Sequence, residues 1–109
     1  MTNRELKQYR EQKKEIAEEI KRLEGMRGKK SMKMVRVIEK KIRKLEKYET
    51  QIEQYIASID NPLARRIMVA RYLDGLSWGK VAQKIGGGNT VESVRKICMR
   101  EIQRANSRR

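Results

Sequence analysis

Apolar residues recur at intervals of three and four along the first half of the chain, which is the spacing of one face of an α-helix. In residues 3–24 they form a heptad stripe interrupted by a single cation, and the stripe consists of Leu6, Tyr9, Lys13, Ile16, Ile20 and Leu23. Such a stripe predicts an amphipathic helix whose narrow apolar face packs against another helix. Residues 25–31, GMRGKKS, then break the pattern with two glycines, and Ser31 is suited to cap a following helix.

The same spacing resumes after this loop and predicts a second helix of about 29 residues, or roughly 43 Å at ~1.5 Å per residue. Its stripe consists of Val35, Ile38, Ile42, Leu45, Glu49, Ile52, Ile56 and Ile59. Two such stripes joined by a short loop predict an antiparallel helical hairpin, a coiled coil over residues 1–60. We expect this hairpin to be a rod rather than a globule. Because each apolar stripe is narrow, the hairpin is also a candidate for self-association into a homo-oligomer.

A second predicted domain covers residues 61–109 and begins at a proline. Pro62 fits the first turn of a helix, and Asn61 before it is a suitable N-cap. This third helix is expected to extend to about Leu73. Ser77 is the expected N-cap of the next one.

Residues 77–96, SWGKVAQKIGGGNTVESVRK, contain two short amphipathic runs joined by three glycines. A phosphate-binding loop needs a strand before its glycines and a Lys-Ser/Thr pair after them, and this segment has neither. The pattern predicts instead a short helix around Ala82, a turn with left-handed backbone at Gly86, and a fifth helix capped by Thr90 or Asn89. The apolar face of that fifth helix is Val94, Ile97, Cys98 and Ile102. The sequence therefore predicts an all-α fold, a helical hairpin followed by a three-helix helix-turn-helix domain.

The charge of the chain favours a polyanionic partner. It has 28 Lys and Arg against 14 Asp and Glu, a net charge of +14, which suits nucleic acid first and an anionic membrane surface second. No apolar run approaches the ~18–20 residues of a membrane-spanning helix, and the first ten residues are too charged for a signal peptide. We therefore expect a soluble, intracellular protein.

The residue types present favour binding over catalysis. With one cysteine and no histidine, the chain can form neither an internal disulfide nor a Cys/His zinc cluster nor a His-dependent triad. We expect no enzymatic activity, cofactor or metal. Cys98 is expected to be a small core residue, and Trp78 and Tyr72 are expected to be core residues of a domain that lacks phenylalanine.

Basic residues are concentrated in two parts of the chain. Residues 27–47 contain ten Lys and Arg against two acids, and residues 61–109 contain eleven against three. The first group either extends a DNA footprint through phosphate contacts or is the solvated face of the hairpin, and the pattern does not decide between them. The last residues, 104–109, are expected to form a disordered polar tail.

The polar face of the fifth helix carries the candidate DNA contacts. Arg95 is the best candidate for reading a base, because its planar guanidinium group can donate hydrogen bonds to guanine O6 and N7. Glu92 could accept a hydrogen bond from cytosine N4. Lys96 and Arg100 are expected to contact phosphates. The alternative is that all of these are ordinary solvated charges. The full predicted set is Lys80, Asn89, Thr90, Val91, Glu92, Arg95, Lys96, Met99 and Arg100.

Residues 71–102, RYLDGLSWGKVAQKIGGGNTVESVRKICMREI, resemble region 4 of RNA polymerase sigma factors in the order of their Ser-Trp helix start, VA pair, glycine and SVRK. Together with the expected coiled coil, the chain resembles phage late-gene transcription regulators of the ArpU and RinA type. From the charge and the predicted helix-turn-helix we expect a transcription regulator that binds double-stranded DNA sequence-specifically. The resemblance further implies phage or prophage origin, and with it the cytoplasm of a bacterial host cell, activation of late genes, and contact with host RNA polymerase. One departure is that the turn between Ala82 and Val94 is longer by about two residues than in the sigma pattern.

Two other functions fit the same features. One is a DNA-packaging accessory protein similar to a small terminase subunit, and the other is a coiled-coil adaptor that binds protein instead of DNA. DNA-dependent transcription separates a regulator from a packaging protein. Absence of DNA binding favours the adaptor.

Overall fold

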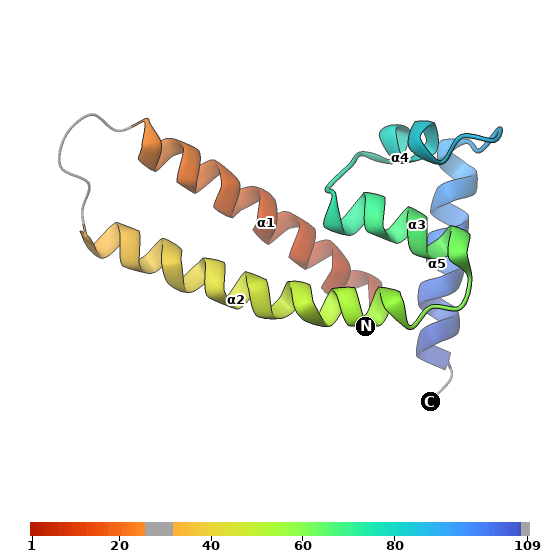
Figure 1. Cartoon of the computed structure of the whole chain (residues 1–109), viewed down its shortest axis with the longest axis horizontal. Helices are drawn as coiled ribbons and strands as arrows, with labels where there is room; N and C mark the ends of the chain where they lie inside the picture. The colour runs from red at the N-terminus through yellow and green to blue at the C-terminus, as the bar shows by residue number, and fades with distance from the viewer. Residues whose placement is uncertain (26–31, 108–109) are drawn as a thin grey trace.

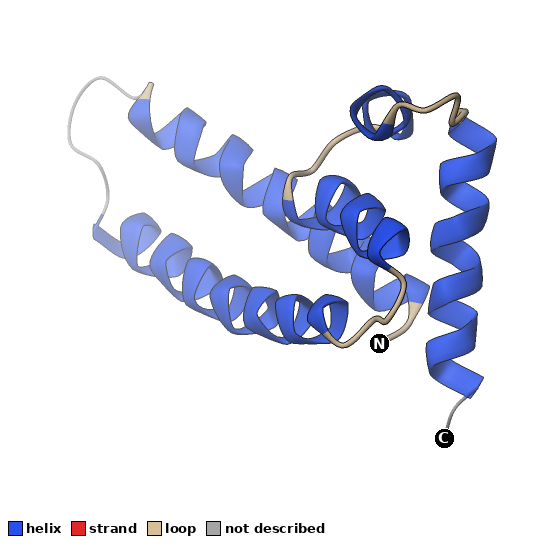
Figure 2. Ribbon diagram, turned by 45° about the vertical axis from the view of Figure 1, so that its right-hand side comes forward, coloured by secondary structure: helices blue, strands red, loops and turns tan. Residues whose placement is uncertain are grey.

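The computed structural model describes residues 1–25 and 32–107, and every regular element within them is helical (Figures 1 and 2). This confirms the predicted all-α class, whereas the expected cap at Ser31 lies outside the described residues. No helix in these ranges combines the length and the apolar character needed to cross a membrane. The elements are α1 (Asn3–Glu24), α2 (Met32–Ala57), α3 (Pro62–Met68), the π-helical turn η1 (Val69–Leu73), α4 (Trp78–Ile85) and α5 (Val91–Ser107).

Helices α1 and α2 lie side by side and run antiparallel (Figure 1). Thr2 caps α1, because its hydroxyl accepts a hydrogen bond from the backbone N–H of Glu5 at 3.2 Å. Tyr48 of α2 donates to the carbonyl of Glu5 at 3.1 Å, and Lys41 donates to the carboxylate of Glu19 at 2.9 Å. The paired residue numbers rise along α1 as they fall along α2, as an antiparallel pair requires.

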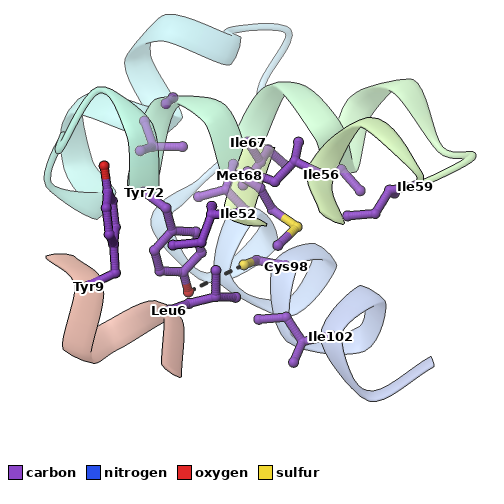
Figure 3. Close-up of a cluster of buried hydrophobic side chains, with 14 of the residues drawn as sticks. Leu6, Tyr9, Ile52, Ile56, Ile59, Ile67, Met68, Tyr72, Cys98 and Ile102 are labelled. Atoms are coloured by element: carbon purple, nitrogen blue, oxygen red, sulfur yellow. Dashed lines mark hydrogen bonds between the residues drawn. The ribbon is translucent and has the colours of Figure 1, made fainter. Parts of the chain in front are cut away.

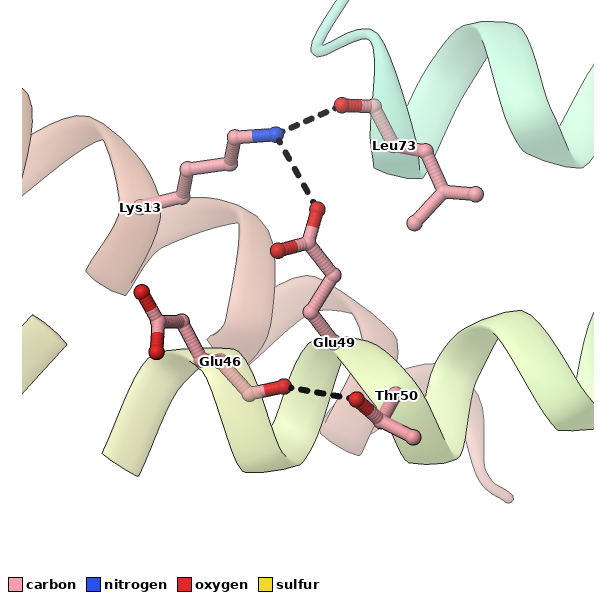
Figure 4. Close-up of polar contacts among 5 residues, drawn as sticks. All are labelled: Lys13, Glu46, Glu49, Thr50 and Leu73. Atoms are coloured by element: carbon pink, nitrogen blue, oxygen red, sulfur yellow. Dashed lines mark hydrogen bonds and ion pairs between the residues drawn. The ribbon is translucent and has the colours of Figure 1, made fainter. Parts of the chain in front are cut away.

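The two charged members of the predicted stripes, Lys13 and Glu49, lie near each other (Figure 4). The Lys13 ammonium is 3.9 Å from a Glu49 carboxylate oxygen and donates to the backbone carbonyl of Leu73 at 2.6 Å. It also lies 5.9 Å from the ring centroid of Tyr9. The cation in the stripe of α1 therefore joins both long helices to the end of η1.

Helix α2 contains 26 residues and ends at Ala57, so it is shorter than predicted. The next helix begins at Pro62, and Asn61 before it is extended, with φ −77° and ψ 114°, so the chain has to leave the helix earlier. Ile59, expected within α2, is buried from the loop after this helix instead. Asn61 accepts hydrogen bonds from two backbone N–H groups of the first turn of α3, at 2.9 and 3.2 Å, and this confirms the predicted cap.

The third predicted helix ends at Leu73 as expected, but its last five residues form the π-helical turn η1. The backbone N–H of Asp74 donates to the carbonyl of Val69 at 2.9 Å, and that of Leu76 donates to Ala70 at 3.0 Å. These bonds span five and six residues, so the turn is wider than an α-helical one. The three-four spacing of apolar residues does not distinguish such a widened last turn from an ordinary one.

One buried cluster extends through both halves of the chain (Figure 3). Leu6 and Tyr9 of α1 are fully buried beside residues of α2, η1 and α5, so the predicted rod is packed against the C-terminal helices over part of its length. The predicted boundary near residue 60 crosses this shared core, and the division into two domains stays a prediction. The cluster consists of Leu6, Tyr9, Ile52, Ile56, Ile59, Ala64, Ile67, Met68, Ala70, Tyr72, Val81, Ala82, Val94, Cys98 and Ile102.

Cys98 is the fully buried core residue that the sequence predicts. Its Sγ lies 3.8 Å from the hydroxyl of Tyr72, which is also buried. Burial raises the pKa of the Cys98 thiol to about 11. The thiol therefore stays neutral near pH 7 and acts as a small apolar side chain rather than a reactive one.

Helix α5 extends to Ser107, so the predicted disordered tail is wrong for residues 104–107. Ile102 is buried and Ala105 is half-buried, and they continue the apolar stripe from Cys98 at steps of four and three. Packing of this stripe against the core accounts for the extra helical turn. Residues 108–109 lie outside the described residues.

Replacing Lys13 tests whether its hydrogen bond joins α1 to η1. We expect Lys13→Ala to lower the free energy of unfolding by about 1 kcal/mol, less than the ~1.5–3 kcal/mol of a buried charged hydrogen bond, because the side chain is 40% exposed. Lys7→Ala, at an exposed position of the same helix, is the control and should change stability by less than about 0.5 kcal/mol. Urea unfolding measures both, and equal losses would contradict the proposed role of Lys13.

Candidate nucleic-acid interface

Helix α4 begins and ends as the sequence predicts. The Ser77 hydroxyl accepts a hydrogen bond from the backbone N–H of Lys80 at 3.3 Å, which caps the helix. Val81 and Ala82 are buried, whereas Lys80 is exposed. Because α4 has only eight residues, this buried face is what holds it against η1 and α5.

The turn after α4 depends on three glycines with positive φ. Gly86 has φ 66° and ψ −152°, and Gly87 and Gly88 have φ 63° and 79°. The positive φ at Gly86 agrees with the prediction, but its extended ψ places it outside the left-handed helical region, in backbone that essentially only glycine adopts. Asn89 closes the turn, because its side-chain amide donates to the Gly86 carbonyl at 2.8 Å.

Thr90 caps α5 through a reciprocal pair of hydrogen bonds with Ser93. The Thr90 hydroxyl accepts from the Ser93 backbone N–H at 3.2 Å, and the Ser93 hydroxyl oxygen accepts from the Thr90 N–H at 2.9 Å. Asn89 and Thr90, both members of the predicted DNA-contact set, thus use their side chains within the turn. Ser93 was missed, although its spacing of three from Thr90 is that of a capping box.

The two faces of α5 follow the predicted division with one correction. Val94, Cys98 and Ile102 are buried, and Ile97 is half-buried. Met99, predicted to face outward, is half-buried against the core, because it follows Cys98 at the edge of the stripe and its flexible side chain can lie over apolar neighbours. The exposed members of the predicted set on α5 are Val91, Glu92, Arg95, Lys96 and Arg100.

Arg71 of η1 lies within the electrostatic influence of a cation from α1 and a cation from α5. Its guanidinium lies 4.5 Å from the ring centroid of Trp78 and donates to the carbonyl of Leu76 at 3.1 Å. Burial and the neighbouring charges of Arg10 and Arg95 lower the pKa of Arg71. Trp78 itself is half-buried at the edge of the core, so the core prediction for this residue holds only in part.

Lys80 of α4 lines a cavity of about 420 Å³ with residues of α1. We call this cavity the α1–α4 pocket. Sequence reasoning missed Arg10 and Lys14 as site residues, because they precede α4 by more than 60 positions and no local pattern links them to it. The pocket is lined by Arg10, Lys13, Lys14, Tyr72, Gly75, Leu76, Ser77 and Lys80.

Three cations of α5, Arg95, Lys96 and Arg100, have no ion-pair partner within the described parts of the chain. The ion pairs there join Lys13 to Glu49, Lys41 to Glu19, and Lys84 to Asp74, and none involves Arg95, Lys96 or Arg100. Helix α5 therefore has one buried apolar face and one face with three unpaired cations.

No protein-family model, curated protein or solved structure matches this chain. The resemblance of residues 71–102 to sigma region 4, and of the chain to regulators of the ArpU and RinA type, stays a prediction. The arrangement of the described side chains is what bears on function.

Alanine at two glycines should have opposite effects. We expect Gly86→Ala to lower the free energy of unfolding by about 1–3 kcal/mol, because a Cβ is strained at its φ and ψ. Gly79→Ala should raise it by about 0.5–1 kcal/mol, since Gly79 lies in α4 and a new Cβ would meet only the Ser77 hydroxyl at 4.0 Å. Thermal and urea unfolding measure both, and a loss of similar size in each variant would contradict a special requirement for glycine in the turn.

Proposed function

We propose that this chain is a sequence-specific double-stranded DNA-binding transcription regulator in which α4 and α5 form a helix-turn-helix. The observation that carries the proposal is the exposed face of α5, where Arg95, Lys96 and Arg100 have no carboxylate partner among the described residues. A helix with one face buried and the other unpaired and basic suits docking into the major groove.

The residues of this face are suited to base contacts or to phosphate contacts, according to their position along α5. Arg95 lies in the second turn, where side chains of a recognition helix meet base edges, and its fork can pair with guanine. Lys96 and Arg100 follow on the exposed side and are suited to phosphates. Glu92, exposed in the first turn, can accept from cytosine N4.

The transcriptional part of the proposal rests on the resemblance of residues 71–102 to sigma region 4. Phage or prophage origin and contact with host RNA polymerase are implied by the same resemblance. The helical hairpin formed by α1 and α2 would then be a fixed part of the DNA-binding unit, because Lys13 and the buried Leu6 and Tyr9 attach it to the C-terminal helices.

Binding to duplex DNA should weaken steeply as salt increases. If about five phosphates are contacted, the slope of log K against log salt should be near −4.5, because each neutralised phosphate releases counterions. Fluorescence anisotropy with a labelled duplex between about 0.05 and 0.3 M salt measures this slope. A flat response, or no binding at low salt, would contradict the DNA-binding role.

Arg95→Ala should reduce specificity more than affinity for random DNA. We expect it to remove about 1–3 kcal/mol of preference between a site selected from a random duplex library and unselected DNA. Arg43→Ala removes the same charge from an exposed position of α2 and should preserve the preference. If folded Arg95→Ala protein still discriminates as well as the unmodified chain, another face of α5 reads the bases.

A further inference from the structure

The α1–α4 pocket concentrates cations from two distant parts of the sequence. Arg10, Lys13 and Lys14 come from α1 and Lys80 from α4, and no carboxylate residue is among those that line the cavity. At about 420 Å³ the pocket has room for a phosphate group with several waters, since one water occupies ~30 Å³ of liquid. Its chemistry therefore suits an oxyanion.

Two of the four cations are free to bind such an anion. Lys13 is engaged with Leu73 and Glu49, and Arg10 makes a longer contact of 3.5 Å with the carbonyl of Gly75. Lys14 and Lys80 are exposed, and in the parts of the chain that the structure describes neither ammonium makes a hydrogen bond or an ion pair. Two ammonium groups that share a pocket repel each other, and an anion between them relieves that repulsion.

A cation of the pocket and a cation of α5 act on the same neighbour. Arg10, which lines the pocket, and Arg95 of α5 both contribute to lowering the pKa of Arg71 through their charge. The pocket and the basic face of α5 therefore both add positive charge to the surroundings of η1. A polyanion with regularly spaced phosphates suits such a distribution of charge better than a single small anion.

We propose that the α1–α4 pocket binds a backbone phosphate of duplex DNA through Lys14 and Lys80, so that α1 is part of the DNA interface. The proposal rests on the proposed function and adds Lys14, a contact from outside the helix-turn-helix, to Lys80 within it. It also bears on the basic residues of α2. Lys40 and Lys44 are exposed and do not line the pocket, so the proposal treats them as solvated charges rather than DNA contacts.

The test compares two double variants of the full chain that each remove two positive charges. We expect Lys14→Ala with Lys80→Ala to weaken binding to selected and random duplexes alike, about tenfold near 0.1 M salt, and to make the salt slope shallower by about 1. Lys40→Ala with Lys44→Ala should weaken binding less than about twofold. The preference for the selected site should stay unchanged in both, because phosphate contacts carry no direct sequence information. All four lysines are exposed, so helical content and the thermal midpoint are expected to stay the same and serve as the folding control.

The possible outcomes separate this proposal from the proposed function. If the unmodified chain binds no duplex, both are wrong. If it binds duplex and the two double variants weaken binding equally, only the pocket proposal is overturned. A second arm measures inorganic phosphate binding by NMR of the Gly75 and Ser77 amides. Shifts with millimolar phosphate, without any effect of Lys14→Ala and Lys80→Ala on duplex binding, would identify a free-phosphate site and also overturn the proposal.

Discussion

The carbonyl groups of the last residue of η1 and of the loop that follows it need hydrogen-bond donors, and three basic side chains supply them. Lys13 donates to Leu73 at 2.6 Å, and Arg71 donates to Leu76 at 3.1 Å. Arg10 contributes a longer contact of 3.5 Å to the Gly75 carbonyl. The last carbonyls of a helix have no partner within it, and cations near them are favoured by the helix dipole. Since two of the three donors belong to α1, the end of η1 and the start of α4 are held against the N-terminal helix.

This way of holding the turn also concentrates positive charge. The Nε atoms of Arg10 and Arg71 are buried without a hydrogen-bond partner among the described residues. The positive charges of the two guanidinium groups also repel each other. Buried donors without partners and like charges in proximity both cost stability. An anion bound beside them would offset part of that cost. The same residues that position α4 thus make its surroundings attractive to phosphate, which joins the structural and the proposed functional roles of this surface.

The predictions from sequence held where the determining interactions are local. The caps at Asn61, Ser77 and Thr90 each depend on residues two or three positions away, and all three are observed. Burial of Val94 and Cys98 follows from helical spacing. These features could be predicted because the residues that determine them are neighbours in the sequence.

What the sequence did not predict depends on contacts between distant segments. The α1–α4 pocket joins residues more than 60 positions apart, and the half-buried position of Met99 depends on which side chains surround α5. The π-helical η1 also differs from a plain helix only in how its last turn closes. The helical end of α5 was missed for a different reason. Composition suggested a polar tail, whereas a single alanine, Ala105, continues the buried stripe.

The long glycine turn illustrates how the local and distant constraints combine. Five residues, from Gly86 to Thr90, separate α4 from α5. Ala82 of α4 and Val94 of α5 are both buried in the shared core, so the two helices remain packed, and Gly86, Gly87 and Gly88 take up the length of the turn with positive φ. Three successive positive φ values are accessible to glycine at little cost and to other residues only with strain. The glycines therefore allow a longer turn without loss of core packing, and the direction in which α5 leaves that turn determines which of its cations are exposed.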